Sequence, residues 1–143
     1  MRRTRHNTDS RKFFDWLEIA ARDLLAARLL FDGEQCLDIV AFHCQQGIEK
    51  ALKAYVIFCT GVPVEGHNLT WLCRQAMKQN RKFGRWLDAT PKMNRFYIET
   101  RYPSDIEFNF TSDTVGEVLS VAQEIYAFVC EEVYGDAMTA EME

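Results

Sequence analysis

Apolar side chains recur every three or four residues along three long segments of this 143-residue chain. In residues 34–60 they are Leu37, Val40, Cys44, Ile48, Ala51, Tyr55 and Cys59. Residues 9–31 carry Phe13, Leu17, Ala20, Leu24, Ala27 and Phe31 at the same steps, and residues 112–134 carry Val115, Val118, Ala122, Ile125, Val129 and Val133. This period places apolar side chains on one face of an α-helix, whereas a half-buried strand needs strict alternation. The pattern therefore predicts three long helices that bury these faces against one another.

Turn residues and capping residues mark where the helices begin and end. The long helices are predicted to end at Asp32-Gly33, at Gly61 before Pro63, and at Gly135, because glycine accepts left-handed geometry and proline lacks an amide donor. Shorter helices are expected over residues 69–80 and 91–100, with a short helical piece over residues 81–89. The expected caps, whose side-chain oxygens accept from free amides, are Asp9 or Ser10, Asn68 or Thr70, and Thr111 or Ser112.

No segment reads as a strand, a repeat or a linker, so the chain is predicted to be all-α. The expected architecture is an antiparallel helical bundle of three long and two short helices. Residues 9–135 are expected to form this single domain, with short tails at residues 1–8 and 136–143. A chain of 143 residues with 48% hydrophobic side chains is large enough for one core.

The composition is typical of a globular protein, with 27% charged and 13% aromatic residues. The basic N-terminus leads into no apolar run of signal-peptide type, and the longest apolar run covers only residues 54–59. We therefore expect a cytoplasmic protein with no membrane association.

Charge is distributed unevenly along the chain. Residues 1–101 carry 17 basic and 11 acidic side chains, whereas residues 102–143 carry ten acidic and no basic side chains. The acidic part repels nucleic acid, and the net charge of −4 is not that of a dedicated nucleic-acid-binding protein. No DNA binding is expected.

Motifs that hold metals or cofactors are absent from the sequence. The five cysteines include no Cys-x-x-Cys pair, so we expect reduced, mostly buried thiols and no metal site. There is no Walker loop, Gly-x-Gly-x-x-Gly, Gly-x-Ser-x-Gly or His-Glu-x-x-His motif. We therefore expect no cofactor and assign no catalytic residue.

A polar row accompanies the apolar face of the second long helix, within the segment HCQQGIEKALKAY. His43, Gln46, Lys50 and Lys53 recur at three- and four-residue steps and so share one side of the helix. A cationic row beside a buried face is suited to holding an anion such as phosphate.

Several motifs in order resemble the HEPN domain (higher eukaryotes and prokaryotes nucleotide-binding). They are the opening WxxxAxxDLxxA from Trp16, the segment HCQQGIEKALKAY, GHNL at residues 66–69, and RYP at residues 101–103 before the last long helix. The resemblance covers about residues 12 to 134. It implies a helical bundle that often forms a homodimer, binds nucleotides, and is frequently encoded beside a minimal nucleotidyltransferase in toxin–antitoxin-like two-gene systems.

Many HEPN proteins are metal-independent ribonucleases that use an arginine followed, after four to six residues, by a histidine. His6, His43 and His67 are the only histidines here, and none has an arginine at that spacing. The ribonuclease motif is therefore absent, and the sequence is placed in the group of the family without it.

We expect a binding pocket lined by side chains from three places in the sequence. Its candidate residues are Gln46, Lys50, Lys53, His67, Arg101 and Tyr102. The lysines and Arg101 would pair with phosphates, Tyr102 would stack on a base, and Gln46 or His67 would bind the edge of the base. Alternatively, Glu49 pairs with Lys53, Lys50 lies in solvent, His67 caps or packs the loop, and Arg101 contacts the acidic last helix.

The function expected from these residues is binding of a nucleotide, or of a nucleotidyltransferase partner, without catalysis. One alternative is a ribonuclease toxin whose noncontiguous site joins His67 and Arg101. Another is a purely structural interaction module.

Overall fold

The computed structural model describes residues 10–99 and 110–142, with the backbone alone for residues 97–99 and 136–142. The helices are α1 (Phe13–Asp32), α2 (Leu37–Thr60), α3 (Leu69–Gln79), the 3₁₀-helix η2 (Arg81–Ala89), α4 (Thr90–Glu99) and α5 (Ser112–Met142). The described ranges contain no strand, which confirms the predicted all-α class.

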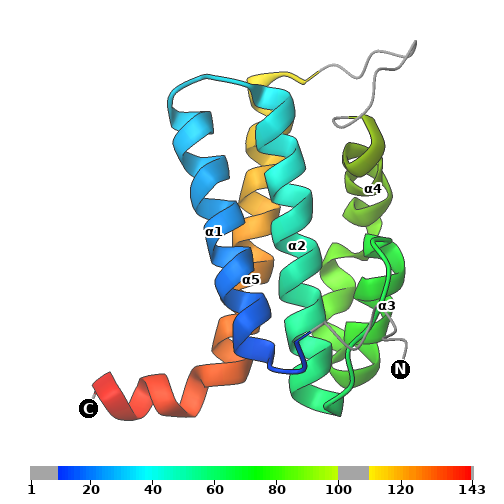
Figure 1. Ribbon diagram of the computed structural model, residues 1–143, viewed down its shortest axis with the longest axis vertical. Helices are drawn as coiled ribbons and strands as arrows, with labels where there is room; N and C mark the ends of the chain where they lie inside the picture. The colour runs from blue at the N-terminus through cyan, green and yellow to red at the C-terminus, as the bar shows by residue number, and fades with distance from the viewer. Residues whose placement is uncertain (1–9, 100–109, 143) are drawn as a thin grey trace, which may run out of the picture.

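Helix α2 is the central element of the bundle. It runs antiparallel to α1, and α5 packs behind both of them (Figure 1). Helices α3 and α4 lie along the side of α2 away from α1. Because neighbours surround its second half, every residue from Ala51 to Ile57 is buried. Polar side chains in this part of α2 therefore need partners within the protein.

The predicted caps of two helices are present. The Asn68 side-chain oxygen accepts a hydrogen bond from the Trp71 amide at 3.0 Å, and the Thr111 hydroxyl accepts one from the Thr114 amide at 3.1 Å. Gly61 ends α2 with φ of 73°, as predicted from its tolerance of left-handed geometry.

Two helix starts differ from the prediction. Helix α1 begins at Phe13 and not near Ser10. The Ser10 hydroxyl donates a hydrogen bond to the carboxylate of Asp15. Helix α2 begins at Leu37 and not at Glu34, because Glu34 and Cys36 have φ of 56° and 50°. Residues with positive φ cannot continue a right-handed helix.

The predicted end of the last helix at Gly135 is wrong, since α5 continues to Met142. Glycine weakens a helix by about 1 kcal/mol relative to alanine but does not by itself end one. A glycine stop requires a left-handed residue there, and Gly135 is not among the residues with positive φ.

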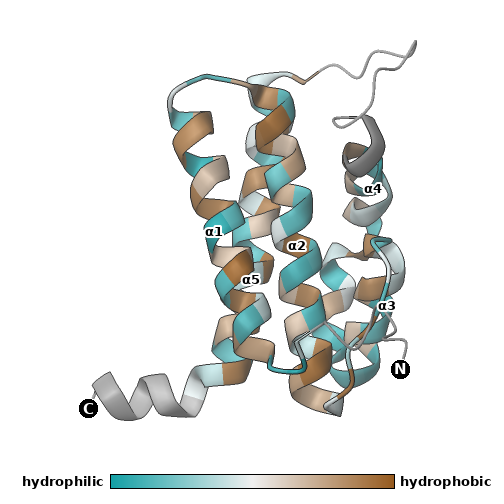
Figure 2. Ribbon diagram, viewed as in Figure 1, coloured by the Kyte–Doolittle hydropathy of each residue, from teal (hydrophilic) through white to brown (hydrophobic). Residues whose placement is uncertain are grey.

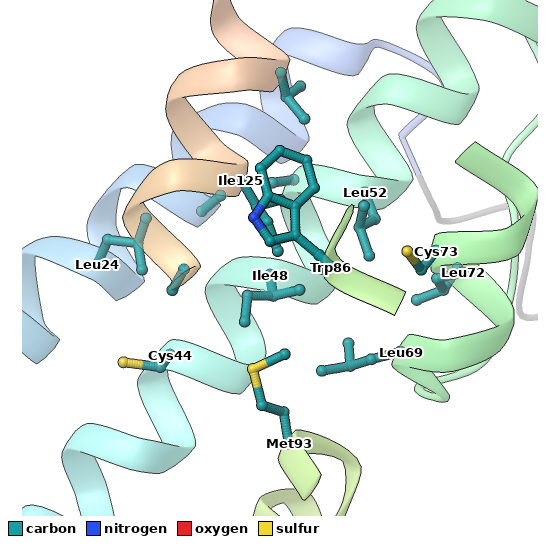
Figure 3. Packing of buried hydrophobic residues seen from close by; sticks show 14 of the residues in the cluster. Leu24, Cys44, Ile48, Leu52, Leu69, Leu72, Cys73, Trp86, Met93 and Ile125 are labelled. Atoms are coloured by element: carbon teal, nitrogen blue, oxygen red, sulfur yellow. The ribbon is translucent and has the colours of Figure 1, made fainter. Parts of the chain in front are cut away.

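The core draws on every described helix. Figure 2 shows brown and teal bands alternating along α1, α2 and α5, as expected for helices with one apolar side. Figure 3 shows part of this core, with labelled side chains from α1 to α5 and from η2. The ring of Phe83 on η2 lies 4.6 Å from that of Tyr55 on α2 and 5.0 Å from that of Phe128 on α5. The predicted apolar faces are confirmed except for Cys59, which is exposed in the last turn of α2.

Helix α2 packs tightly against α1 at Gly47. A Cβ atom at this position would lie 2.8 Å from Cδ2 of Leu24 and 3.7 Å from the carbonyl oxygen of Ala20. Because Gly47 has no side chain, the side chain of Leu24 on α1 can pack directly against the backbone of α2.

No helix within the described ranges combines the length and the apolar composition that a bilayer span requires.

Candidate functional site

The buried carboxylate of Glu49 is the centre of a polar cluster. Its side chain has no exposed surface. One oxygen, Oε2, lies 3.0 Å from Nζ of Lys50 and 3.2 Å from Nζ of Lys53. The other oxygen, Oε1, lies 3.0 Å from Nδ1 of His67. Three basic side chains therefore converge on one carboxylate, which we call the Glu49 cluster.

The helical period of α2 builds most of this cluster. Gln45, Glu49 and Lys53 follow one another at four-residue steps, so they share a row, and all three are buried. The Gln45 amide approaches Glu49 Oε1 at 3.5 Å, at the outer limit of a hydrogen bond, and its own oxygen accepts from the Gln46 amide at 2.6 Å. Glu49 thus contacts both of its neighbours in the row, Gln45 at this limit and Lys53 through an ion pair.

His67 enters the cluster from the loop between α2 and α3. The preceding residue, Gly66, has φ of 98°, a conformation that only glycine adopts without strain. The motif GHNL therefore has a local explanation: its glycine permits the turn, its histidine reaches Glu49, and Asn68 caps α3.

The indole ring of Trp16, on α1, completes the cluster on another side. The ammonium groups of Lys50 and Lys53 lie 5.6 Å and 5.4 Å from the centre of this ring. Such contacts stabilise a cation by about 0.5–2 kcal/mol, depending on desolvation. The Trp16 Nε1 donates to the backbone oxygen of Ser10 at 2.9 Å, which fixes the orientation of the ring.

The carboxyl group of Glu49 is held in its ionised form by the basic side chains around it. Burial raises the pKa of Glu49, but the nearby Lys50, Lys53 and His67 lower it more, and the net result is a pKa below the usual range. Within the described residues, the Glu49 carboxylate thus lies between the nitrogens of three basic side chains.

Access to the cluster is uneven. The Lys53 side chain is 6% exposed, the Lys50 side chain 18%, and the His67 side chain 53%. A ligand approaching from solvent would therefore meet Lys50 and His67, with Glu49 and Lys53 beneath them.

The structure brings together Gln46, Lys50, Lys53 and His67, four of the predicted site residues. The alternative in which Lys50 lies in solvent is wrong, and the pairing of Glu49 with Lys53 is present. Arg101 and Tyr102, the other two, lie outside the described residues.

The predicted binding pocket left out three members of the cluster, Gln45, Glu49 and Trp16, although the alternative interpretation did pair Glu49 with Lys53. The missed signal was the spacing of Gln45, Glu49 and Lys53, which forms a second polar row one step around the helix. Helical spacing tells on which side of α2 a residue lies, but it does not tell whether another segment of the chain packs against that side.

A second polar contact joins the same side of α2 to α1. Nδ1 of His43 lies 2.9 Å from Oδ1 of Asp23, and the two side chains are 28% and 18% exposed. His43, the first member of the predicted polar row, thus has a specific partner on α1. The contact lies two helical turns from Lys50.

The cysteines do not form a site. Cys44 and Cys73 are buried, and burial raises the pKa of their thiols to about 12 and about 11, which makes them poor nucleophiles. Cys36 and Cys59 are exposed, so the prediction of mostly buried thiols is wrong for these two. In the described part of the chain, no three His, Cys, Asp or Glu side chains are placed to hold a metal ion.

Comparison with known proteins agrees with the fold and the motifs. The model of the HEPN domain matches residues 14–133, so the chain belongs to the HEPN family. No curated protein matches it.

Two solved structures are similar to this chain. One is TT1696 from Thermus thermophilus, with 28% identity and a TM-score of 0.75, covering 85% of this chain and 98% of that one. The other is ST0689, described as an archaeal HEPN homologue, with 24% identity, a TM-score of 0.67 and the same coverage. The second likeness concerns the fold alone.

Proposed function

We propose that this chain is a non-catalytic HEPN module that binds a nucleotide at the Glu49 cluster. The observation that supports this most is the convergence of Lys50, Lys53 and His67 on the carboxylate of Glu49, two of them on the same oxygen. Clusters of basic side chains that exceed their internal counter-charge favour phosphate groups.

The side chains have different roles in this proposal. Lys50 and His67, the more exposed pair, contact phosphate oxygens, while Lys53 stays paired with Glu49. Arg101 binds a further phosphate, and Tyr102 stacks on the base. Gln46 is near enough to the cluster to bind a polar edge of the ligand.

The proposal excludes RNA cleavage by the arginine–histidine motif, because the sequence lacks it. Incubation of RNA with purified protein, without metal and at several pH values, tests this point. Intact RNA is the expected result, and specific cleavage would favour the ribonuclease alternative.

Nucleotide binding is tested by thermal unfolding in a panel of nucleotides. At a ligand concentration ten times Kd, binding stabilises the fold by about 1.4 kcal/mol, which corresponds to a rise in Tm of roughly 3–6 °C. Lys50→Ala and Arg101→Ala are expected to remove most of the shift. Lys78→Ala changes an exposed lysine of α3 and serves as the control. No shift for any nucleotide at millimolar concentration would refute the proposal.

We further propose that the module acts in the cytoplasm as a homodimer, as the companion of a minimal nucleotidyltransferase in a two-gene system. The module corresponds to residues 9–135 in this proposal. An adjacent nucleotidyltransferase gene, and its product eluting together with this chain in size-exclusion chromatography, are the expected observations. A monomer that does not bind the neighbouring gene product would contradict this role.

A further inference from the structure

The basic groups of the Glu49 cluster converge on a region the size of one small anion. Lys50, Lys53 and His67 each place a nitrogen within 3.2 Å of one of the two oxygens of Glu49. Those two oxygens belong to one carboxylate, so the three nitrogens gather around a single acidic group. A nucleic-acid strand would require basic groups repeated along its length.

The basic surface does not continue along α2. One turn before Lys50 lies Gln46, which is neutral, and before that lies His43 in contact with the carboxylate of Asp23. A second phosphate on this line would meet the negative charge of Asp23, which is 18% exposed. The positive region is thus bounded by a carboxylate on this side.

We propose that the Glu49 cluster binds one terminal phosphate group of a nucleotide. The phosphate forms an ion pair with Lys50 in place of the ion pair between Lys50 and Glu49. Glu49 is the internal counter-anion of the site, and its negative charge limits the affinity for the phosphate. This inference rests on the proposed nucleotide binding and specifies how it occurs. Glu49 therefore weakens ligand binding, although it lies at the centre of the site.

Charge and donor number favour a terminal phosphate over a phosphodiester. A terminal phosphate carries about −1.5 to −2 at neutral pH and offers three acceptor oxygens, whereas an internal phosphodiester carries one negative charge. The ligand must compete with a carboxylate that already lies 3.0 Å from Lys50. The group with more charge and more acceptors competes better.

The two lysines differ in their readiness to exchange partners. Lys50 is three times as exposed as Lys53 and can turn its ammonium group toward solvent. Glu49 has no exposed surface, so it stays beside Lys53 and Gln45 while the ligand binds. It therefore continues to repel the phosphate, and removing its charge raises affinity.

Isothermal titration calorimetry with three probes tests the inference: adenosine monophosphate, the dinucleoside monophosphate ApA, and adenosine. Wild-type protein is expected to bind adenosine monophosphate about tenfold more tightly than ApA or adenosine. Glu49→Gln keeps the shape of the side chain and removes its charge, and it is expected to raise the affinity for adenosine monophosphate about tenfold. Lys50→Gln abolishes the preference for the terminal phosphate, and Lys78→Gln, the matched control, retains it.

The outcomes separate this inference from the proposed function. If the wild-type protein binds adenosine monophosphate but folded Glu49→Gln binds it no more tightly, the counter-anion role is refuted and nucleotide binding stands. ApA binding as tight as that of adenosine monophosphate refutes the terminal-phosphate assignment. If only Glu49→Gln binds, nucleotide binding by the natural chain is refuted and the counter-anion role stands; if neither binds, both are refuted.

A second variant covers the case in which Glu49→Gln does not fold because buried Lys53 and partly buried Lys50 lack a counter-charge. The double variant Glu49→Gln/Lys53→Gln removes one charge of each sign and leaves Lys50 without a carboxylate beside it. It is expected to bind adenosine monophosphate at least as tightly as the wild type. Weaker binding by this folded variant would overturn the inference.

Discussion

The close approach of α1 and α2 at Gly47 gives a quantitative prediction for Gly47→Ala. In an exposed helix this change stabilises by about 1 kcal/mol, since alanine has the higher helix propensity. Here the new methyl group would lie 2.8 Å from Cδ2 and 3.0 Å from Cγ of Leu24. Leu24 is 7% exposed and packed in the core, so its whole side chain must move.

Overpacking of this kind costs about 1–3 kcal/mol, which exceeds the gain in helix propensity. The net expectation is that Gly47→Ala lowers the free energy of unfolding by about 1 kcal/mol. Leu24→Ala alone is expected to lower it by about 2–5 kcal/mol because it leaves a cavity. In the Leu24→Ala background the clash is absent, so Gly47→Ala should become stabilising by about 1 kcal/mol.

Urea denaturation of the four proteins in this double-mutant cycle measures the coupling. The expected coupling between the two positions is about 2 kcal/mol, with reversal of the sign of Gly47→Ala between the two backgrounds. Gly135→Ala is the control, because a Cβ there meets no atom within 4 Å. If Gly47→Ala is stabilising in the wild-type background, the argument that a side chain cannot fit at this position is refuted.

Three further predictions concern single side chains. The ionised form of Glu49, whose pKa is lowered, stabilises the fold above the pKa of the unfolded chain, and this stability is lost as pH falls through the folded pKa. Glu49→Gln should therefore flatten the acid side of a profile of unfolding free energy against pH, and an unchanged profile would contradict an ionised carboxylate. Iodoacetamide should modify exposed Cys36 in the native protein and spare buried Cys44, whose thiol has a pKa of about 12. Equal rates of alkylation at the two cysteines, measured by peptide mass spectrometry, would show that α2 opens. Phe83→Ala, at a fully buried residue, should lower the free energy of unfolding in urea by about 3–5 kcal/mol. Trp71→Ala, at a residue that is 44% exposed, should lower it by less than about 1 kcal/mol. Similar losses of stability in the two variants would place Trp71 in the core.

The helices were predictable because their determinants are local. The steps from Leu17 to Ala27 and from Val40 to Tyr55 follow one helical period, and both faces are buried as predicted. The caps at Asn68 and Thr111 were predictable for the same reason, since each acts on an amide three residues away. The end of α5 was not, because glycine permits a stop without requiring it.

The sequence predicted which side of α2 carries the candidate site, but not the environment of its residues. Spacing placed Gln46, Lys50 and Lys53 on one side of the helix, and His67, predicted for the same pocket, lies beside Glu49 in the structure. Spacing did not show that this side is covered, so the sequence suggested lysines available to a ligand. The structure instead places a buried carboxylate against both lysines, which changes the expected affinity of the site.

By itself, the sequence determined the helical class, the buried faces and most cap positions, because these depend on residues within one or two helical turns. The tertiary structure alone decided that Trp16 of α1 and His67 of the loop meet the lysines of α2 around Glu49. It also decided that Glu49 is buried and remains charged. Those properties depend on how closely separate segments pack, since both desolvation and Coulomb interactions depend on distances between side chains that the order of residues does not specify.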